Sequence, residues 1–285
     1  MHDLPFGQGQ GQLLWLFSGT GEGPRLARAW LERGWRLEVF VVSAAAARAY
    51  PPAPAFQVRV GPVGDQAALV QRLQAARAAE QAPAWIVDAT HPFATRISAD
   101  LAAVCTQQQQ PLLRLVRPAP SGGEADSAIV VPNLEALTAI VPVGERVLLA
   151  IGARDLARAF AALPERQLHA RVLPTAESLA LALASGLPSA RLAALRPTSV
   201  DRPILGALCR QWAITTVIAR ASAGSTERCW RQVQGDLGLR LVLLQRPQLQ
   251  LPGVELTWPE ALRRLSPGDD APARRGIVGV GGPVG

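Results

Sequence analysis

The chain contains no lysine, because all 29 of its basic residues are arginine. This absence excludes several enzyme mechanisms at once. A Walker A loop needs a lysine on the β- and γ-phosphates, a pyridoxal-phosphate enzyme needs one for its Schiff base, and a short-chain dehydrogenase needs Tyr-x-x-x-Lys. Any nucleotide that this protein binds must therefore be held by other groups.

Cysteines and long apolar runs are also scarce. The three cysteines, Cys105, Cys209 and Cys229, have no C-x-x-C spacing and no histidine nearby in the sequence, so we expect structural thiols, no metal site and no disulfide framework. No run reaches the roughly 18 apolar residues of a membrane span, and the first dozen residues do not resemble a signal peptide. We therefore expect a cytoplasmic protein that does not contact membranes.

The formal net charge is +7, and aromatic residues make up only 5% of the 285 residues. The arginines are spread along the chain, whereas an RNA-binding module needs a basic face with aromatic platforms. An anionic small molecule explains the charge as well, since arginine binds carboxylates and phosphates in a bidentate manner. We expect no nucleic-acid partner and keep a basic RNA-binding module as the weaker alternative. The sequence does not set the oligomeric state and is compatible with a monomer.

Short apolar runs alternate with longer helical stretches from Leu13 onward, a pattern typical of βαβ units around a parallel sheet. The sequence predicts an α/β fold of two Rossmann-like open parallel-sheet domains with a cleft between them. The predicted strands are 13–17, 37–42, 85–87, 112–116, 147–151, 169–173, 191–195, 215–218 and 240–244. The predicted helices are 24–33, 65–80, 95–107, 156–163, 176–185, 204–212 and 226–237.

The segment 119–124, Ala-Pro-Ser-Gly-Gly-Glu, has the composition of a linker. We therefore expect an N-terminal domain over residues 1–120 and a C-terminal domain over 121–247. Residues 248–285 are expected to form a tail, disordered from about Leu265 because Pro, Gly and charged residues dominate there.

A glycine turn follows the first predicted strand, where Ser18-Gly19-Thr20-Gly21-Glu22-Gly23-Pro24 leads into a helix. Glycines let the backbone approach a phosphate, and the free N–H groups at a helix start attract the anion. Pro24 occupies the third glycine position of the dinucleotide fingerprint, so a simple tight turn is the alternative. We assign Gly19, Thr20 and Gly21 to a dinucleotide phosphate.

The second predicted strand ends without the Asp or Glu that binds the ribose 2′-hydroxyl of NAD. Ser43 and Arg48 follow it instead. A hydroxyl with a nearby guanidinium suits a 2′-phosphate. The sequence therefore favours NADPH over NADH, with Ser43 and Arg48 as ligands.

The segment 85–94, Trp-Ile-Val-Asp-Ala-Thr-His-Pro-Phe-Ala, is a strand that ends in polar residues. Such residues lie where open α/β sheets bind their ligands. We expect Asp88, Thr90 and His91 to orient substrate or handle a proton. In the alternative reading Asp88 and Thr90 only cap the helix that begins near Thr95.

Three loops of the second half carry similar residue types: 149–154, 195–199 and 220–225. Each follows a predicted strand and contains Gly, Ser, Thr or Arg. Together they are candidates for a ligand-binding wall, while each by itself is also typical of an ordinary strand-to-helix loop.

The ordered set of these motifs resembles the precorrin-6A reductases, including the cobalt-precorrin-6A reductases. The resemblance spans roughly 13 to 247, and its most specific block is Asp-Ala-Thr-His-Pro-Phe-Ala at 88–94. The other matching segments are 19–20, 60–64, Ser98, 112–118, 151–152, 171–174, the loop after Leu195, Ser222 with Gly224, and 246–247.

The resemblance implies an NADPH-dependent oxidoreductase that delivers hydride to one double bond of a corrin-forming tetrapyrrole, without a metal cofactor. It places the cofactor over the first domain's glycine turn and the substrate in the interdomain cleft. The substrate carries many acetate and propionate groups, which arginines bind well. The substrate-binding candidates are Ser98, Arg114, Arg117, Arg154, Arg196, Arg220 and Ser222.

The second half departs from the family pattern at two places. Residues 196–198 read Arg-Pro-Thr where the family has Gly-Pro-Phe, and 220–223 read Arg-Ala-Ser-Ala where it has Lys-x-Ser-Gly. Arg220 keeps the charge but not the compact ammonium group. The alternative function is therefore a non-catalytic NADP(H)- or tetrapyrrole-binding protein of the same fold.

Overall fold

The chain folds into two compact units, seen in a computed structural model that describes residues 11–50, 52–118, 127–196 and 202–265. The first unit comprises Met1–Val116 and Leu249–Gly285, and the second comprises Arg117–Gln248. The second unit is thus inserted into the first near the end of the first unit's sheet.

The first unit is built on a six-stranded parallel sheet with the strand order β12-β5-β4-β1-β2-β3. Its strands are β1 (Leu13–Ser18), β2 (Arg36–Val41), β3 (Phe56–Val60), β4 (Trp85–Ala89), β5 (Leu112–Leu115) and β12 (Val254–Leu256). Read from the other edge, this is the Rossmann order 3-2-1-4-5-6, with β12 as the sixth strand. The strand order reverses between β1 and β4, where such folds bind dinucleotides.

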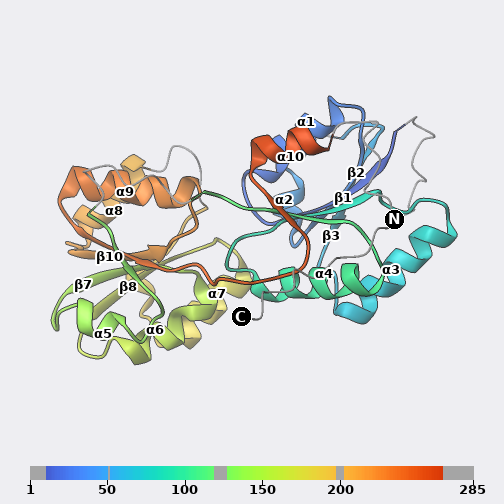
Figure 1. Cartoon of the computed structure of the whole chain (residues 1–285). Helices are drawn as coiled ribbons and strands as arrows, with labels where there is room; N and C mark the ends of the chain where they lie inside the picture. The colour runs from blue at the N-terminus through green and yellow to red at the C-terminus, as the bar shows by residue number, and fades with distance from the viewer. Residues whose placement is uncertain (1–10, 51, 119–126, 197–201, 266–285) are drawn as a thin grey trace, which may run out of the picture. The chain divides into compact units, whose positions relative to one another are not determined.

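Helices cover both faces of this sheet (Figure 1), and their bounds are α1 (Gly23–Leu31), α2 (Ala44–Ala47), α3 (Gln66–Ala78), α4 (Thr95–Gln107) and α10 (Trp258–Arg264). Side chains of β1 alternate between the two apolar layers, as the two-residue period of a strand requires. Leu14 and Leu16 pack with α1 and α10. Trp15 and Phe17 pack with α3 and α4. The strand is therefore buried on both sides.

The second unit repeats this plan in another six-stranded parallel sheet, ordered β6-β11-β10-β7-β8-β9. Its strands are β6 (Ile129–Val131), β7 (Arg146–Ala150), β8 (Gln167–Val172), β9 (Leu192–Ala194), β10 (Thr216–Arg220) and β11 (Arg240–Leu244). Here the order reverses between β7 and β10. The outer strand β6 comes before β7 in the chain, whereas its counterpart β12 comes last.

The helices of the second unit are α5 (Leu137–Ile140), α6 (Leu156–Ala162), α7 (Ala176–Ala184), α8 (Arg202–Gln211) and α9 (Ser225–Leu237), with 3₁₀ turns η1 (Ala153–Asp155) and η2 (Ser189–Arg191). Cys209 of α8 and Trp230 of α9 pack on one face of the sheet. Two α/β units with open parallel sheets confirm the predicted fold class.

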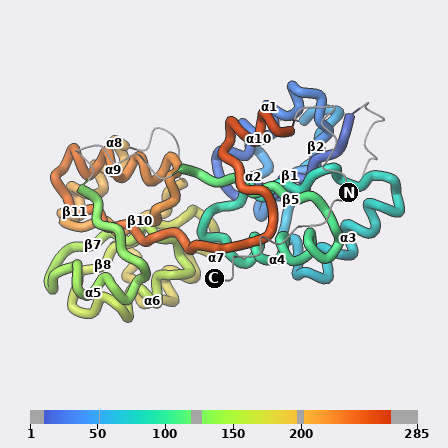
Figure 2. Tube along the Cα trace, viewed as in Figure 1, coloured from blue at the N-terminus to red at the C-terminus, as the bar shows by residue number. Residues whose placement is uncertain are grey.

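The structure differs from the sequence-based expectation at the strands β3, β6 and β12, which no predicted strand covers, and at the tail. The boundary lies between Val116 and Arg117 rather than after residue 120. Residues 249–265, expected to begin a tail, instead form β12 and α10 of the first unit, and Figure 2 shows the late α10 beside the early α1. Three-residue strands carry too little periodicity to be recognised in a sequence. The expected linker at 119–124 and the expected disorder beyond 265 lie outside the described residues.

The cysteines occupy the expected kind of environment. Cys105 and Cys209 are buried, and no disulfide joins them. Burial raises the pKa of the Cys105 thiol to about 12 and that of Cys209 to about 11, which disfavours reactive thiolates. Within the described part of the chain, no helix is both long and apolar enough to cross a membrane, and no cluster of metal-ligating side chains occurs.

Candidate functional site

The glycine turn lies at the point where the first sheet reverses its strand order, between β1 and α1. Gly19 and Gly21 are exposed. Among the described residues, the backbone N–H groups of Thr20 and Gly21 donate to no backbone acceptor. The Thr20 hydroxyl is buried and has no hydrogen-bond partner there either. These unsatisfied donors suit an anion.

Two of the glycines have different roles. A Cβ at Gly21 would meet no atom within 4 Å, so the space in front of it is open. A Cβ at Gly23 would fall 1.9 Å from Ser18 Oγ and 2.2 Å from Tyr50 Oη. Gly23 thus supplies the close helix–strand packing that the third glycine of the dinucleotide fingerprint supplies, one residue earlier. Sequence reasoning missed this role, although a third glycine in the turn was the signal for it.

The Tyr50 hydroxyl donates to Ser18 Oγ at 2.8 Å in the buried space beside Gly23. Burial raises the pKa of Tyr50, and the hydrogen bond to Ser18 opposes this rise. This pair fixes the first turn of α1 against the end of β1.

Replacing Gly23 by alanine should therefore destabilise the first unit. The added methyl overlaps two buried oxygens, and overpacking of this kind costs about 1–3 kcal/mol. Urea unfolding should show this loss for Gly23→Ala. Gly235→Ala is the matched control, because a Cβ at Gly235 meets nothing within 4 Å. An unchanged unfolding midpoint for Gly23→Ala would contradict the packing role.

Ser43 and Arg48 flank the short helix α2 after β2. Ser43 is its N-cap, and its Oγ accepts from the Ala46 N–H at 3.2 Å. Arg48 follows the last residue of the helix and is exposed. The carboxyl end of β2 bears no acidic residue, as the sequence indicated.

Asp88 organises the turn between β4 and α4. Its side chain is only 4% exposed. Asp88 Oδ1 accepts from the Thr90 N–H at 3.0 Å and from Thr90 Oγ1 at 2.6 Å. Thr90 Oγ1 lies 3.3 Å from Ser98 Oγ, which is buried on α4. Asp88, Thr90 and Ser98 are therefore brought together. The N-cap residue of α4, Ala94, makes no side-chain cap hydrogen bond, so capping of α4 by Asp88 or Thr90 is not observed.

His91 lies between this network and the glycine turn. A Cβ on Gly19 would be 3.4 Å from the His91 backbone nitrogen. His91 Nδ1 accepts from the Phe93 N–H at 3.2 Å. An accepting Nδ1 leaves the ring proton of neutral histidine on Nε2.

Arg114 of β5 contacts two carboxylates. Its Nε lies 3.6 Å from Asp88 Oδ2, and its Nη1 donates to Glu255 Oε1 at 2.7 Å. Glu255 belongs to β12 and was not recognised from the sequence.

The second unit has a comparable arrangement at its own point of strand-order reversal. Gly152 follows β7 with a φ of +90°, which favours glycine. Arg220, at the end of β10, lies against Gly152 and donates to Asp155 Oδ2 at 2.6 Å. Arg117 Nη1 donates to the Ser222 carbonyl at 2.9 Å, so Arg117, Arg220 and Ser222 gather near the ends of β7 and β10.

The remaining candidates of the second unit stand apart from that group. Arg154 is exposed and pairs with Glu177 at 2.7 Å. Arg196 is exposed after β9. The loop 197–201, which includes Thr198 of the Arg-Pro-Thr departure, lies outside the described residues.

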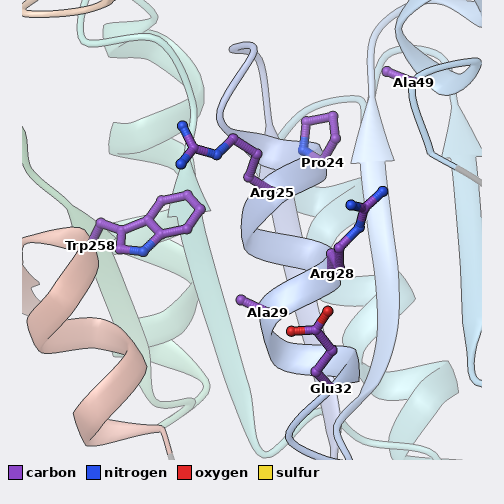
Figure 3. A pocket seen from close by; sticks show the side chains of 7 residues that line it. All are labelled: Pro24, Arg25, Arg28, Ala29, Glu32, Ala49 and Trp258. Atoms are coloured by element: carbon purple, nitrogen blue, oxygen red, sulfur yellow. The ribbon is translucent and has the colours of Figure 1, made fainter.

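A shallow pocket of about 270 Å³ lies on the outer side of α1 (Figure 3). Arg25 and Arg28 of α1 line it together with Trp258 of α10. The Arg25 guanidinium lies 5.4 Å from the centre of the Trp258 ring. None of the predicted site residues lines this pocket, so we place the candidate site at the ends of the strands.

Fold and site together define a Rossmann-type protein in which a glycine turn and a polar strand end meet at the switch point. The family model "Precorrin-6x reductase CbiJ/CobK" matches residues 13–265. This chain belongs to that family, whose members are oxidoreductases of cobalamin biosynthesis that act on a ring double bond.

Individual relatives agree with this membership. The chain is 35% identical over 245 residues to the cobalt-precorrin-6A reductase of Synechocystis sp., covering 84% of this chain and 90% of the relative. It is 31% identical over 236 residues to the precorrin-6A reductase of Rhodobacter capsulatus, covering 82% and 88%. A solved structure titled CobK precorrin-6A reductase matches with a TM-score of 0.70 and 27% identity, covering 89% of this chain and 95% of that one.

Proposed function

We propose that this protein catalyses the NADPH-dependent reduction of one ring double bond in precorrin-6A or cobalt-precorrin-6A. The observation that carries the proposal is the open glycine turn at the switch point of the first sheet, in a member of this reductase family. Its Thr20 hydroxyl has no hydrogen-bond partner among the described residues.

The residues of the turn fit a dinucleotide pyrophosphate. The N–H groups of Thr20 and Gly21 and the Thr20 hydroxyl are donors without a partner among the described residues. The open space at Gly21 lets a phosphate approach the backbone, and α1 adds the positive end of its dipole. NADPH bound here would supply the hydride. These N–H and O–H donors favour an anion in this position, although Glu22, the N-cap residue of α1, also belongs to the turn.

The preference for NADPH over NADH would come from Arg48 and Ser43. Arg48 has no ion pair among the described residues, so a 2′-phosphate would be its main partner. Arg48→Ala should lower kcat/KM for NADPH by roughly 10- to 100-fold, since it removes a charge-assisted hydrogen bond, and leave NADH nearly unchanged. Arg33→Ala, at an exposed arginine just after α1, is the matched control. Equal losses with both cofactors would contradict the role of Arg48.

The chain's own residues would prepare the second step of the reduction, the addition of a proton. Hydride and proton together add two hydrogens across one carbon–carbon double bond. His91 Nδ1 accepts from the Phe93 N–H, so the neutral ring carries its hydrogen on Nε2. The form that gives up a proton would be the imidazolium, which takes its extra proton from solvent and returns to the neutral ring when Nε2–H is donated to the substrate carbon. Asp88 and Thr90 hold the turn that carries His91 beside Gly19. We therefore assign proton donation to His91 and positioning to Asp88, Thr90 and Ser98.

The substrate is a polycarboxylate, and the second unit offers guanidinium groups for it. Arg117, Arg220 and the Ser222 backbone lie together at the ends of β7 and β10. Arg154 and Arg196 are exposed on neighbouring loops. We propose that these arginines bind acetate and propionate groups. The cleft expected between the domains stays a prediction, as does the cytoplasmic location.

One assay tests the proposed function and the non-catalytic alternative together. NADPH and NADH oxidation are followed at 340 nm with precorrin-6A and with its cobalt form, with each substrate and cofactor also measured alone. Oxidation that depends on both NADPH and a substrate supports the reductase. Tight NADPH binding without turnover on either substrate would favour the non-catalytic binding protein.

A further inference from the structure

Three charged side chains lie in one row across the first sheet. The parallel register pairs Asp88 of β4 with Arg114 of β5, and Arg114 with Glu255 of β12. Neighbouring residues in such a row are close enough for their side chains to interact. The row therefore places one guanidinium between two carboxylates.

The row runs from the interior to the surface. The side chains of Asp88, Arg114 and Glu255 are 4%, 16% and 47% exposed. The Arg114 Nη1 donor is held by Glu255 at 2.7 Å. The Nε group is buried without a hydrogen-bond partner in the described part of the chain, 3.6 Å from Asp88 Oδ2. Glu255 thus fixes the outer end of the guanidinium, and its inner side faces Asp88.

The other carboxylate oxygen of Asp88, Oδ1, binds the Thr90–His91 turn. Oδ1 accepts both the backbone N–H and the hydroxyl of Thr90. A buried carboxylate is costly without a nearby opposite charge, and hydrogen bonds to a charged acceptor are the strong ones. Arg114 is the charged partner at Oδ2, so the order of the Thr90–His91 turn depends on it.

We propose that Arg114 and Glu255 are positioning residues, which hold Asp88 and thereby the Thr90–His91 turn beside the glycine turn. This proposal differs from the sequence-based expectation that Arg114 binds a substrate carboxylate, since Asp88 and Glu255 of the chain itself lie against its guanidinium. Glu255 lies 141 residues after Arg114 in the sequence, beyond the inserted second unit. The catalytic consequence rests on the proposed function, but the positioning itself does not.

Hydrogen exchange tests the positioning without any ligand. The Thr90 amide, bonded to Asp88 Oδ1, should exchange about tenfold faster in Arg114→Met and about threefold faster in Glu255→Ala, because each weakens a charge-assisted bond. Arg114→Lys should restore most of the protection, since it keeps the charge. Glu135→Ala is the matched control, as it removes another Glu–Arg pair at 2.9 Å, in the second unit. Amides of β1 report general loss of stability and should stay unchanged.

Steady-state kinetics then separate positioning from substrate binding. Arg114→Met and Glu255→Ala should lower kcat while the substrate KM changes less than about twofold, and Arg114→Met should add nothing to Asp88→Asn, as expected for residues acting in one network. An unchanged Thr90 exchange rate in both variants would overturn the proposal. A substrate KM raised about tenfold by Arg114→Met with normal exchange would make Arg114 a substrate ligand instead. If the wild type binds no NADPH, the proposed function fails, yet the exchange rates still decide this inference.

Discussion

His91→Ala should lower kcat by about 100-fold, the usual size of a lost general acid, while the NADPH dissociation constant changes less than about twofold. His91 Nδ1 accepts from the Phe93 N–H at 3.2 Å, so Nε2 is the ring nitrogen from which the imidazolium form would give its proton. The substitution removes that proton and leaves the glycine turn untouched. Single-turnover kinetics with saturating NADPH measure the chemical step directly.

A second substitution at this position separates the proton from the shape of the turn. Asparagine can place its side-chain oxygen near the position of Nδ1 and accept from Phe93, but it has no group that replaces Nε2. His91→Asn should therefore be as slow as His91→Ala. If either variant turned over at the wild-type rate, water or another group would be the proton donor.

Gly21→Val should abolish most cofactor affinity without affecting the fold. A Cβ at Gly21 meets nothing within 4 Å, and Gly21 is not among the glycines with a positive φ. The protein can accommodate the side chain, but it then fills the space proposed for the pyrophosphate. We expect the NADPH dissociation constant to rise about 100-fold, since several charge-assisted bonds are lost. The free energy of unfolding should change by less than about 0.5 kcal/mol.

Isothermal titration calorimetry and urea unfolding of the same preparations make this comparison. Gly235→Val is the matched control, because Gly235 also faces open space, but on α9 of the second unit. It should bind NADPH like the wild type. Wild-type affinity in Gly21→Val would remove the glycine turn from the cofactor site.

Much of the first unit was predictable because its signals are local. β1 is apolar from Leu13 to Phe17, the glycine turn follows at once, and the Asp-Ala-Thr-His block comes at the end of β4. Each pattern occupies fewer than ten or so residues, within reach of periodicity and turn chemistry. The parallel pairing of β1 with β4 then places the carboxyl ends of the two strands side by side.

The features that could not be predicted from the sequence depend on contacts between distant segments of the chain. Gly23 is needed because Tyr50 arrives beside Ser18, which no local pattern indicates. Glu255 lies on a three-residue strand that joins the sheet only after the second unit is complete. The pairing of Arg114 with a carboxylate of β12 therefore could not be predicted from the sequence.

Isotope transfer tests the proposed reaction most directly. NADPH carrying deuterium at both C4 positions of the nicotinamide is incubated with the protein and precorrin-6A, or its cobalt form, in ordinary water. The reduced macrocycle should contain a single deuterium by mass spectrometry, since hydride comes from the cofactor and the proton from solvent through the chain. A reduced product without deuterium, or unchanged macrocycle in both reactions, would contradict hydride transfer from NADPH.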